Sequence, residues 1–358
     1  MSVPSATSWA MSEAAGADGE SIAGDAPVLA LSINGEAVSD PAETFPVLAQ
    51  IFEVFVHLTD RQGGRFPDVT VMLVDDLHAA MAEVSGEPGF TGERLGGMVA
   101  GKTVKTDPQW AAATVILAAG LWPDGEATPI GTLLLCHEFT HALLGGLRKG
   151  EGWCRVEGDN DATFTARAIA VECIDEIRAD CFADGLLRQF AYAETPSGEI
   201  RPATTIDLLG GRSESVLDVI STHVHPAWPD LVTQYRTHQV DLGTLWSTLA
   251  SHTEQALLTM AHTDAEHFID EAQPTAIASA AEHPGMVHYL GPVWHAIALP
   301  LRSETLIPTA EQIAQSDIDV GAAGETAILA MWAKLGVTAE TVDGGLYLHV
   351  TDPDAVGS

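Results

Sequence analysis

The chain has 358 residues, 46% of them hydrophobic, so it is long and apolar enough to bury a large core in one domain or in two lobes. Its 16 lysines and arginines stand against 50 aspartates and glutamates, which gives a net charge of −34. Such a charge repels phosphate backbones and anionic membranes, so it argues against nucleic-acid binding and favours cationic segments of a peptide or protein as partners.

Residues 1–25 are rich in alanine, glycine, serine and acidic side chains, and they lack the positive and apolar regions of a secretory signal. We expect them to form a mobile acidic tail. No uninterrupted apolar run approaches the ~18 residues that a membrane-spanning helix needs. The four cysteines, Cys136, Cys154, Cys173 and Cys181, are too few for a disulfide framework and are expected to be packed thiols. The sequence therefore predicts a cytoplasmic protein without a membrane segment.

The first half of the chain predicts strands that alternate with helices. A short hairpin is expected over residues 27–38, because Asn34-Gly35 stands between alternating apolar residues. Asp40-Pro41 has the form of a helix start, and helical spacing continues from Phe45 to Leu58, with Pro46 able to kink it. Further on, periodicity predicts a strand over Val69–Val74, a helix over Leu77–Val84, one or two strands over Gly96–Thr106, and a strand over Ala113–Ala119.

An apolar, helix-favouring run from Leu133 to His141 contains His137-Glu138-x-x-His141. On a helix, residues four apart lie on one face, so both imidazoles can aim at one point while Glu138 lies about 100° round the axis. A catalytic zinc ion typically has three protein ligands and one water, and a neighbouring carboxylate can take the proton of that water. The pattern predicts a zinc site with Glu138 as general base. A chance match is the alternative, since the chain holds 14 histidines.

Two histidines leave such a site one ligand short. Leu144 and Leu147 stand where a metzincin requires glycine and histidine, which excludes that family. Downstream, residues 161–190 are predicted to form one long helix, with Glu176 and Asp180 on a face of small or apolar residues. An unpaired carboxylate in such packing is costly. We therefore expect Glu176 to be the third ligand and Asp180 to accept a hydrogen bond from a ligand histidine. A solvated acidic edge is the alternative.

His137-Glu138-x-x-His141 followed by Glu176-x-x-x-Asp180 resembles the arrangement of the gluzincin metallopeptidases. The stretch from Glu176 to Leu187 is also similar to the second-helix motif of the ImmA/IrrE-type metallopeptidases. The resemblance covers residues 133–190. It implies an α+β fold, in which a zincin-like catalytic lobe combines a small mixed sheet with long helices.

The resemblance implies two further features of the site. An extended substrate would pair with an edge strand beside the cleft, either along Thr114–Ala119 or along Met98–Val104. A donor would also be needed for the oxyanion that develops during hydrolysis. The candidates are His288, Tyr289 and His295, among which spacing does not choose.

Gly96-x-x-x-x-Gly101-Lys102-Thr103 has the spacing of a nucleotide-binding phosphate loop. A phosphate loop follows a buried strand and opens a helix. Here polar residues precede the motif, and a strand-like run that ends at Pro108 follows it. The context argues against nucleotide binding.

The second half of the chain is predicted to be mainly helical. Thr195–Arg212 has the composition of a connector. The pair His223-Val-His225 lacks a full ligand set, so structural histidines are the preferred interpretation there. Helices are expected over Ser213–Thr222, Leu231–His238, Leu242–Met260, Asp264–Ala272, Met286–Leu299 and Ala322–Leu335, with a final strand over Leu346–Val350.

Together these patterns predict an acidic tail (1–25), a zincin-like catalytic lobe (26–192) and a mainly helical lobe with a short C-terminal strand (193–358). The predicted function is that of a zinc-dependent metallopeptidase. Two alternatives remain open from the sequence. One is a zinc enzyme that acts on a small molecule, and the other is a non-catalytic helical binding protein with a structural metal site.

Overall fold

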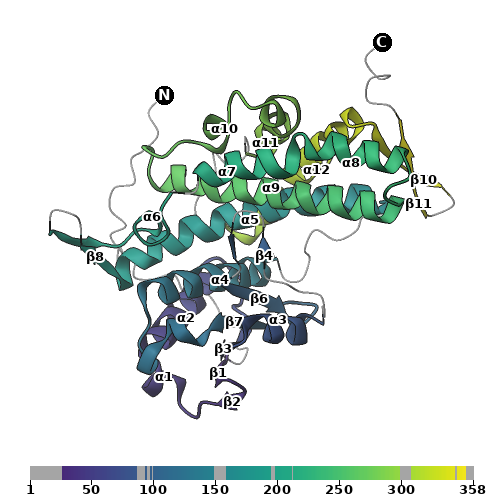
Figure 1. Ribbon diagram of the computed structural model, residues 1–358. Coiled ribbons are helices and arrows are strands. Elements are labelled where there is room, and N and C mark those ends of the chain that lie inside the picture. Colours follow the sequence, from purple (N-terminus) through teal and green to yellow (C-terminus); the bar gives the residue numbers. More distant parts are fainter. Residues whose placement is uncertain are drawn as a thin grey trace.

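The computed structural model describes residues 26–86, 93–94, 97–98, 100–148, 159–194, 198–211, 213–298, 308–342 and 345–351 (Figure 1). The predicted acidic tail, Gly96 and Cys154 lie outside these residues. The protein is an α+β structure in which a small mixed sheet is accompanied by many helices, as expected.

The sheet has five strands in the order β2-β1-β3-β7-β6. Its three central strands, β1, β3 and β7, are parallel, and the edge strands β2 and β6 run antiparallel to their neighbours. The predicted hairpin is present, because Asn34 and Gly35 take the positive φ angles of 48° and 85° that its tight turn requires. The strands are β1 Leu29–Ile33, β2 Glu36–Ala37, β3 Asp68–Val74, β6 Gly101–Lys105 and β7 Ala112–Ala118.

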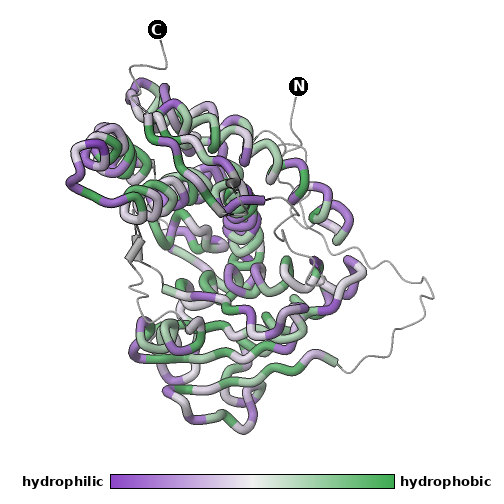
Figure 2. The backbone as a smooth tube through the Cα atoms, turned by 90° about the vertical axis from the view of Figure 1, so that its right-hand side faces the viewer, coloured by the Kyte–Doolittle hydropathy of each residue, from purple (hydrophilic) through white to green (hydrophobic). Residues whose placement is uncertain are grey.

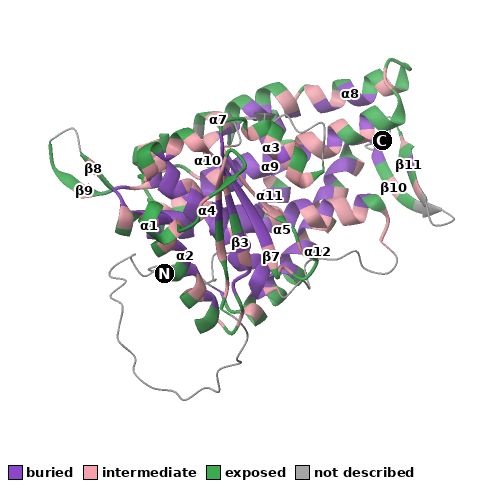
Figure 3. Ribbon diagram, turned by 90° about the horizontal axis from the view of Figure 1, so that it is seen from below, coloured by how far each residue is buried: buried purple, intermediate pink, exposed green. Residues whose placement is uncertain are grey.

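Helices cover both faces of this sheet. On one face α2 (Pro46–Arg61) and α4 (Pro129–Leu147) form a core with the inward residues of β3 and β7. On the other face α3 (Leu77–Ser85) packs through Met81 against Ile116. Figure 3 shows the strands β3 and β7 as buried and the outer faces of the helices as exposed. The predicted kink at Pro46 is a break between two helices, since α1 (Pro41–Thr44) ends before it.

The predicted long helix is present as α5 (Asp161–Phe190). Its first two thirds, from Ala162 to Cys181, belong to the core of the helical part, whereas Phe182 and Leu187 belong to the core of the sheet part. Figure 1 shows α5 running between the sheet with its helices and the helices that follow in the chain. Because α5 contributes to both cores, the predicted division at residue 192 stays a prediction.

The remainder of the described chain is mostly helical and differs from expectation in several places. The last helix begins at Ala310 and not at Ala322, and a strand that was not predicted, over Val337–Val342, precedes the final one. The predicted connector contains a hairpin of β8 (Tyr192–Glu194) and β9 (Ile200–Pro202) and a helix, α6 (Thr205–Leu209). The two helices predicted on either side of residues 261–263 are one helix, α9 (Leu242–Ile269), because no residue there breaks the hydrogen-bonded ladder. The other elements are α7 Ser213–Val219, η3 Ile220–Val224, α8 Ala227–Arg236, α10 Ala276–Ser279, η4 Met286–Leu290, α11 Gly291–Ala298, α12 Ala310–Lys334, β10 Val337–Val342 and β11 Gly345–Val350.

Hydrophobic and hydrophilic residues alternate around most of these helices, as Figure 2 shows. Helix α4 is largely apolar apart from two threonines and the motif residues His137, Glu138 and His141. Among the described residues α4 is the one helix long and apolar enough to cross a membrane, and 78% of its apolar window is buried inside the protein. Helix α4 carries the histidine motif and belongs to the hydrophobic core that it forms with α2, β3 and β7.

Candidate metal centre

Helix α4 is positioned by its own start signals and by close packing. The Thr128 hydroxyl accepts a hydrogen bond from the Gly131 backbone N–H at 3.0 Å, and Pro129 follows as the first helical residue. Near the other end, a Cβ at Gly145 would lie 2.2 Å from the ring of Trp110, so only glycine fits there. These features fix where the histidine face of α4 points.

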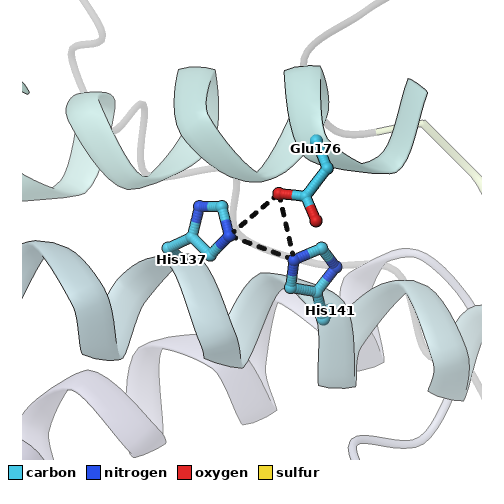
Figure 4. A group of neighbouring side chains, drawn as sticks. All are labelled: His137, His141 and Glu176. Carbon is cyan, nitrogen blue, oxygen red and sulfur yellow. Dashed lines mark hydrogen bonds and ion pairs between the residues drawn. The ribbon is translucent and has the colours of Figure 1, made fainter. Parts of the chain in front are cut away.

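His137 and His141 from α4 meet Glu176 from α5, as the sequence predicted (Figure 4). The two Nε2 atoms are 3.1 Å apart, and the Oε2 atom of Glu176 lies 3.2 Å from that of His137 and 3.7 Å from that of His141. Tetrahedral zinc with bonds of about 2.0–2.1 Å places its ligand atoms roughly 3.4 Å apart. The separations match that value. Two imidazole nitrogens and a carboxylate oxygen are also a donor set that zinc accepts in catalytic sites.

The charges of the three side chains depend on one another. Burial alone would lower the pKa of His137, but its hydrogen bonds to Asp180 and Glu176 outweigh burial and raise that pKa well above its usual value. Burial alone would raise the pKa of Glu176, but His141 and His137 outweigh it and hold that pKa well below its usual value. A metal ion would take over the role of these protons, because imidazole ligands bind a metal in the neutral form.

Asp180 connects a ligand to a histidine that the sequence analysis did not single out. Its Oδ1 atom is 2.9 Å from Nδ1 of His137, as predicted for a residue that orients a ligand. Its Oδ2 atom is 2.7 Å from Nδ1 of His262, on α9. The Nε2 atom of His262 in turn lies 3.8 Å from Oε2 of Glu176. The sequence did not indicate His262 as a site residue, because it lies in the gap between the two helices that were predicted where the structure has the single helix α9.

His262 does not belong to the group of ligand atoms. Among the described residues, the side chains whose ligand atoms all lie within 4.8 Å of one another are His137, His141 and Glu176. A metal held by these three keeps one coordination position for water or substrate. His262 therefore lies beside the ligands as a hydrogen-bonding neighbour.

Glu138 lies between α4 and the edge strand β6, and only 5% of it is exposed. The Thr103 hydroxyl on β6 lies 2.8 Å from Oε2 of Glu138. Burial alone would lower the pKa of His141, but Glu176, with a smaller contribution from Glu138, outweighs burial and raises that pKa. Glu138 is thus a buried carboxyl group beside the candidate metal-binding group.

A buried network of ion pairs lies next to Glu176 in α5. Arg148, at the end of α4, binds Asp175 through two bonds of 2.6 and 2.8 Å and Asp317 on α12 through two bonds of 2.6 and 2.9 Å. Burial alone would raise the pKa of Asp175, but Arg148 outweighs it and lowers that pKa. The network fixes α4, α5 and α12 relative to one another, one residue away from Glu176.

The three residues predicted as candidate oxyanion donors, His288, Tyr289 and His295, do not contact the metal-binding group in the described part of the chain. His288 and His295 are exposed, and Tyr289 packs with its ring centroid 6.4 Å from that of His225 and 5.9 Å from that of Trp228. Within the described part of the chain, no hydrogen bond, ion pair or ring contact joins His288 or Tyr289 to the three ligands. The structure brings together the ligands, Asp180 and Glu138, and it adds His262 to them.

The cysteines of the described residues, Cys136, Cys173 and Cys181, are free and buried. Burial raises the pKa of all three thiols above the usual value, which keeps them protonated and unreactive. They are outside the group of ligand atoms. They act as packed thiols, as expected.

A comparison with protein-family models, with curated proteins and with solved structures finds no match to this chain. The argument for a function therefore depends on the geometry of the site.

Proposed function

We propose that this protein is a zinc-dependent metallopeptidase with a zincin-like catalytic region. The observation that carries the proposal is the convergence of His137, His141 and Glu176 from two helices, with the buried carboxyl group of Glu138 beside them. A three-ligand group supports a catalytic site over a structural one, because structural zinc sites usually have four protein ligands.

Zinc bound by these three ligands would polarise a scissile carbonyl group and lower the pKa of a water molecule. Glu138 would accept the proton of the attacking water and pass it to the leaving amine. His262, in its protonated form, would donate its Nε2–H to the carbonyl oxygen, while its Nδ1–H donates to Asp180 and so fixes the orientation of the ring. It is a closer candidate for this role than His288 or Tyr289.

The substrate would be an extended peptide that adds to β6. Of the two segments that the sequence offered, β7 pairs with β3 on one side and β6 on the other, so it has no open edge. In the described residues β6 pairs with β7 alone, and it runs directly over Glu138. Peptides bind open strand edges through their main chains. The charge of −34 favours a basic peptide.

Glu138→Gln tests this proposal. Glutamine has nearly the same shape but cannot take a proton, so the variant should keep its zinc and its fold and lose turnover by roughly 10²-fold or more. The assay uses quenched fluorogenic peptides rich in lysine and arginine, with zinc content measured on the same preparations and His141→Ala as the metal-deficient control. Full turnover by zinc-loaded Glu138→Gln would refute the mechanism. A zinc-loaded parent protein that cleaves none of the peptides would refute the assignment as a peptidase.

A further inference from the structure

At Gly101, strand β6 packs tightly against both Leu117 of β7 and Glu138 of α4. A Cβ atom on Gly101 would lie 2.7 Å from a methyl group of Leu117, 3.1 Å from Oε1 of Glu138 and 3.3 Å from its Cγ. The first distance is shorter than real contacts of a Cβ atom. Because residue 101 has no side chain, the carboxyl group of Glu138 fits between the strand and the helix.

Two residues further along β6, the side chain returns to the same face of the strand. The Oγ1 atom of Thr103 lies 2.8 Å from Oε2 of Glu138 and 2.8 Å from the backbone oxygen of Glu138. A hydroxyl group has one proton and donates it to one acceptor at a time. The bond to the carboxylate is the stronger of the two, because a charged acceptor strengthens a hydrogen bond.

Thr103 is separated from Glu138 by 35 residues in the sequence and comes from a different layer of the fold. Thr103 is the one hydrogen-bond partner of the Glu138 carboxyl group that the described contacts contain. The bond occupies Oε2 and leaves Oε1 to accept a proton. A buried carboxylate without a fixed partner would lose this preferred orientation.

We infer that Thr103 is a positioning residue, which holds the Glu138 carboxyl group in the orientation that proton transfer at the metal centre requires. The inference rests on the proposed function. It also gives the edge strand a second role, because the strand proposed to bind substrate carries the hydroxyl that orients the base. The same bond accounts for Thr103 in the Gly101-Lys102-Thr103 motif, where it lies in a strand and not at the start of a helix.

Acetohydroxamic acid provides a test that needs no substrate. It would bind zinc through its two oxygens as the hydroxamate anion. The proton that it loses passes to the solvent unless a neighbouring base takes it, and a correctly oriented Oε1 of Glu138 would take it and hydrogen-bond to the bound anion. The affinity of acetohydroxamic acid for the zinc-loaded protein therefore reports whether the base is correctly oriented. Affinity is measured by calorimetric titration of the full chain at matched zinc content.

Thr103→Val and Thr103→Ala both remove the hydroxyl and should weaken acetohydroxamate binding by roughly tenfold, the scale of one hydrogen bond to a charged group. Thr103→Ser keeps the hydroxyl and should bind within about threefold of the parent, a change within the scatter of single interactions. The matched control is Thr114→Val, which removes a buried hydroxyl from the adjacent strand, opposite Val104. Zinc content should be unchanged in all four variants.

The inference is overturned if either variant without the hydroxyl binds acetohydroxamate as the parent does, or if Thr103→Ser is as weak as they are. Loss of zinc by Thr103→Val and Thr103→Ala would also overturn it, because Thr103 would then support the ligands and not the base. A parent protein that binds neither zinc nor acetohydroxamate would refute the proposed function itself. The two failures are therefore distinguishable.

Discussion

Replacement of Asp180 by asparagine should weaken zinc binding, because this carboxylate accepts hydrogen bonds from two histidines. Asparagine has one acceptor oxygen and an amide group that only donates. It cannot replace both the 2.9 Å bond to His137 and the 2.7 Å bond to His262. The side chain is 8% exposed, so water is poorly placed to compensate. Loss of such a partner should lower zinc affinity roughly 10–100-fold, which corresponds to about 1.4–2.7 kcal/mol.

The assay is competition for zinc against a chromogenic chelator at one fixed pH. Asp184→Asn is the matched control, because Asp184 is buried on the same helix but bonds the Thr205 backbone N–H and Arg188, both at 2.7 Å. That variant should lose folding stability and keep its zinc affinity. His262→Gln removes the second bond alone, so that Asp180 still accepts from His137 with its full charge, and it should weaken zinc binding less than Asp180→Asn does. Parental affinity in Asp180→Asn, or an equal loss in Asp184→Asn, would refute the reasoning.

Three further outcomes are expected. Zinc affinity should rise with pH until the folded-state pKa of His137 is passed, because that pKa is raised and zinc must displace the proton at lower pH. Calorimetry in buffers of different ionisation enthalpy measures the released protons. A pH-independent affinity would contradict the prediction. Arg148→Met would leave the buried Asp175 and Asp317 with only the longer contacts of 3.5 and 3.9 Å to Arg178 among the described residues, and should cost up to about 3–5 kcal/mol in urea unfolding. A loss below about 1 kcal/mol, the scale of exposed pairs, would show that the network is not desolvated. Gly101→Ala should cost about 1–3 kcal/mol through overpacking, whereas Gly120→Ala, with nothing within 4 Å of the added methyl group, should change stability little.

Local patterns in the sequence were sufficient for the elements that hold the ligands. The spacing of apolar residues predicted α5 with the bounds that the structure has, and it predicted the strand now called β3 to within one residue. The candidate ligands His137 and His141 are four residues apart on one helix, so helical geometry brings them together without any tertiary information. Glu176 was identified because a carboxylate among small and apolar residues needs a partner.

Features that depend on packing between distant segments could not be predicted in this way. His262 is 82 residues from Asp180, and no periodicity within α9 indicates which of its residues meets α5. The sequence placed Thr103 in a predicted strand and in a phosphate-loop motif, but it could not indicate the bond to Glu138, because that bond depends on the position of β6 beside α4. The order of the strands likewise follows from crossovers between elements, which is why β7 and β6 could not be ranked as edge strands from the sequence.

X-ray absorption at the zinc edge of the purified protein tests the central claim most directly. The proposed site predicts about one zinc ion per chain with four nitrogen or oxygen donors at about 2.0–2.1 Å. Two of these donors should show imidazole scattering, from His137 and His141. His141→Ala should abolish stoichiometric zinc. A sulfur donor at about 2.3 Å, a third imidazole that closes the open position, or a full equivalent of zinc in His141→Ala would contradict a three-ligand catalytic centre.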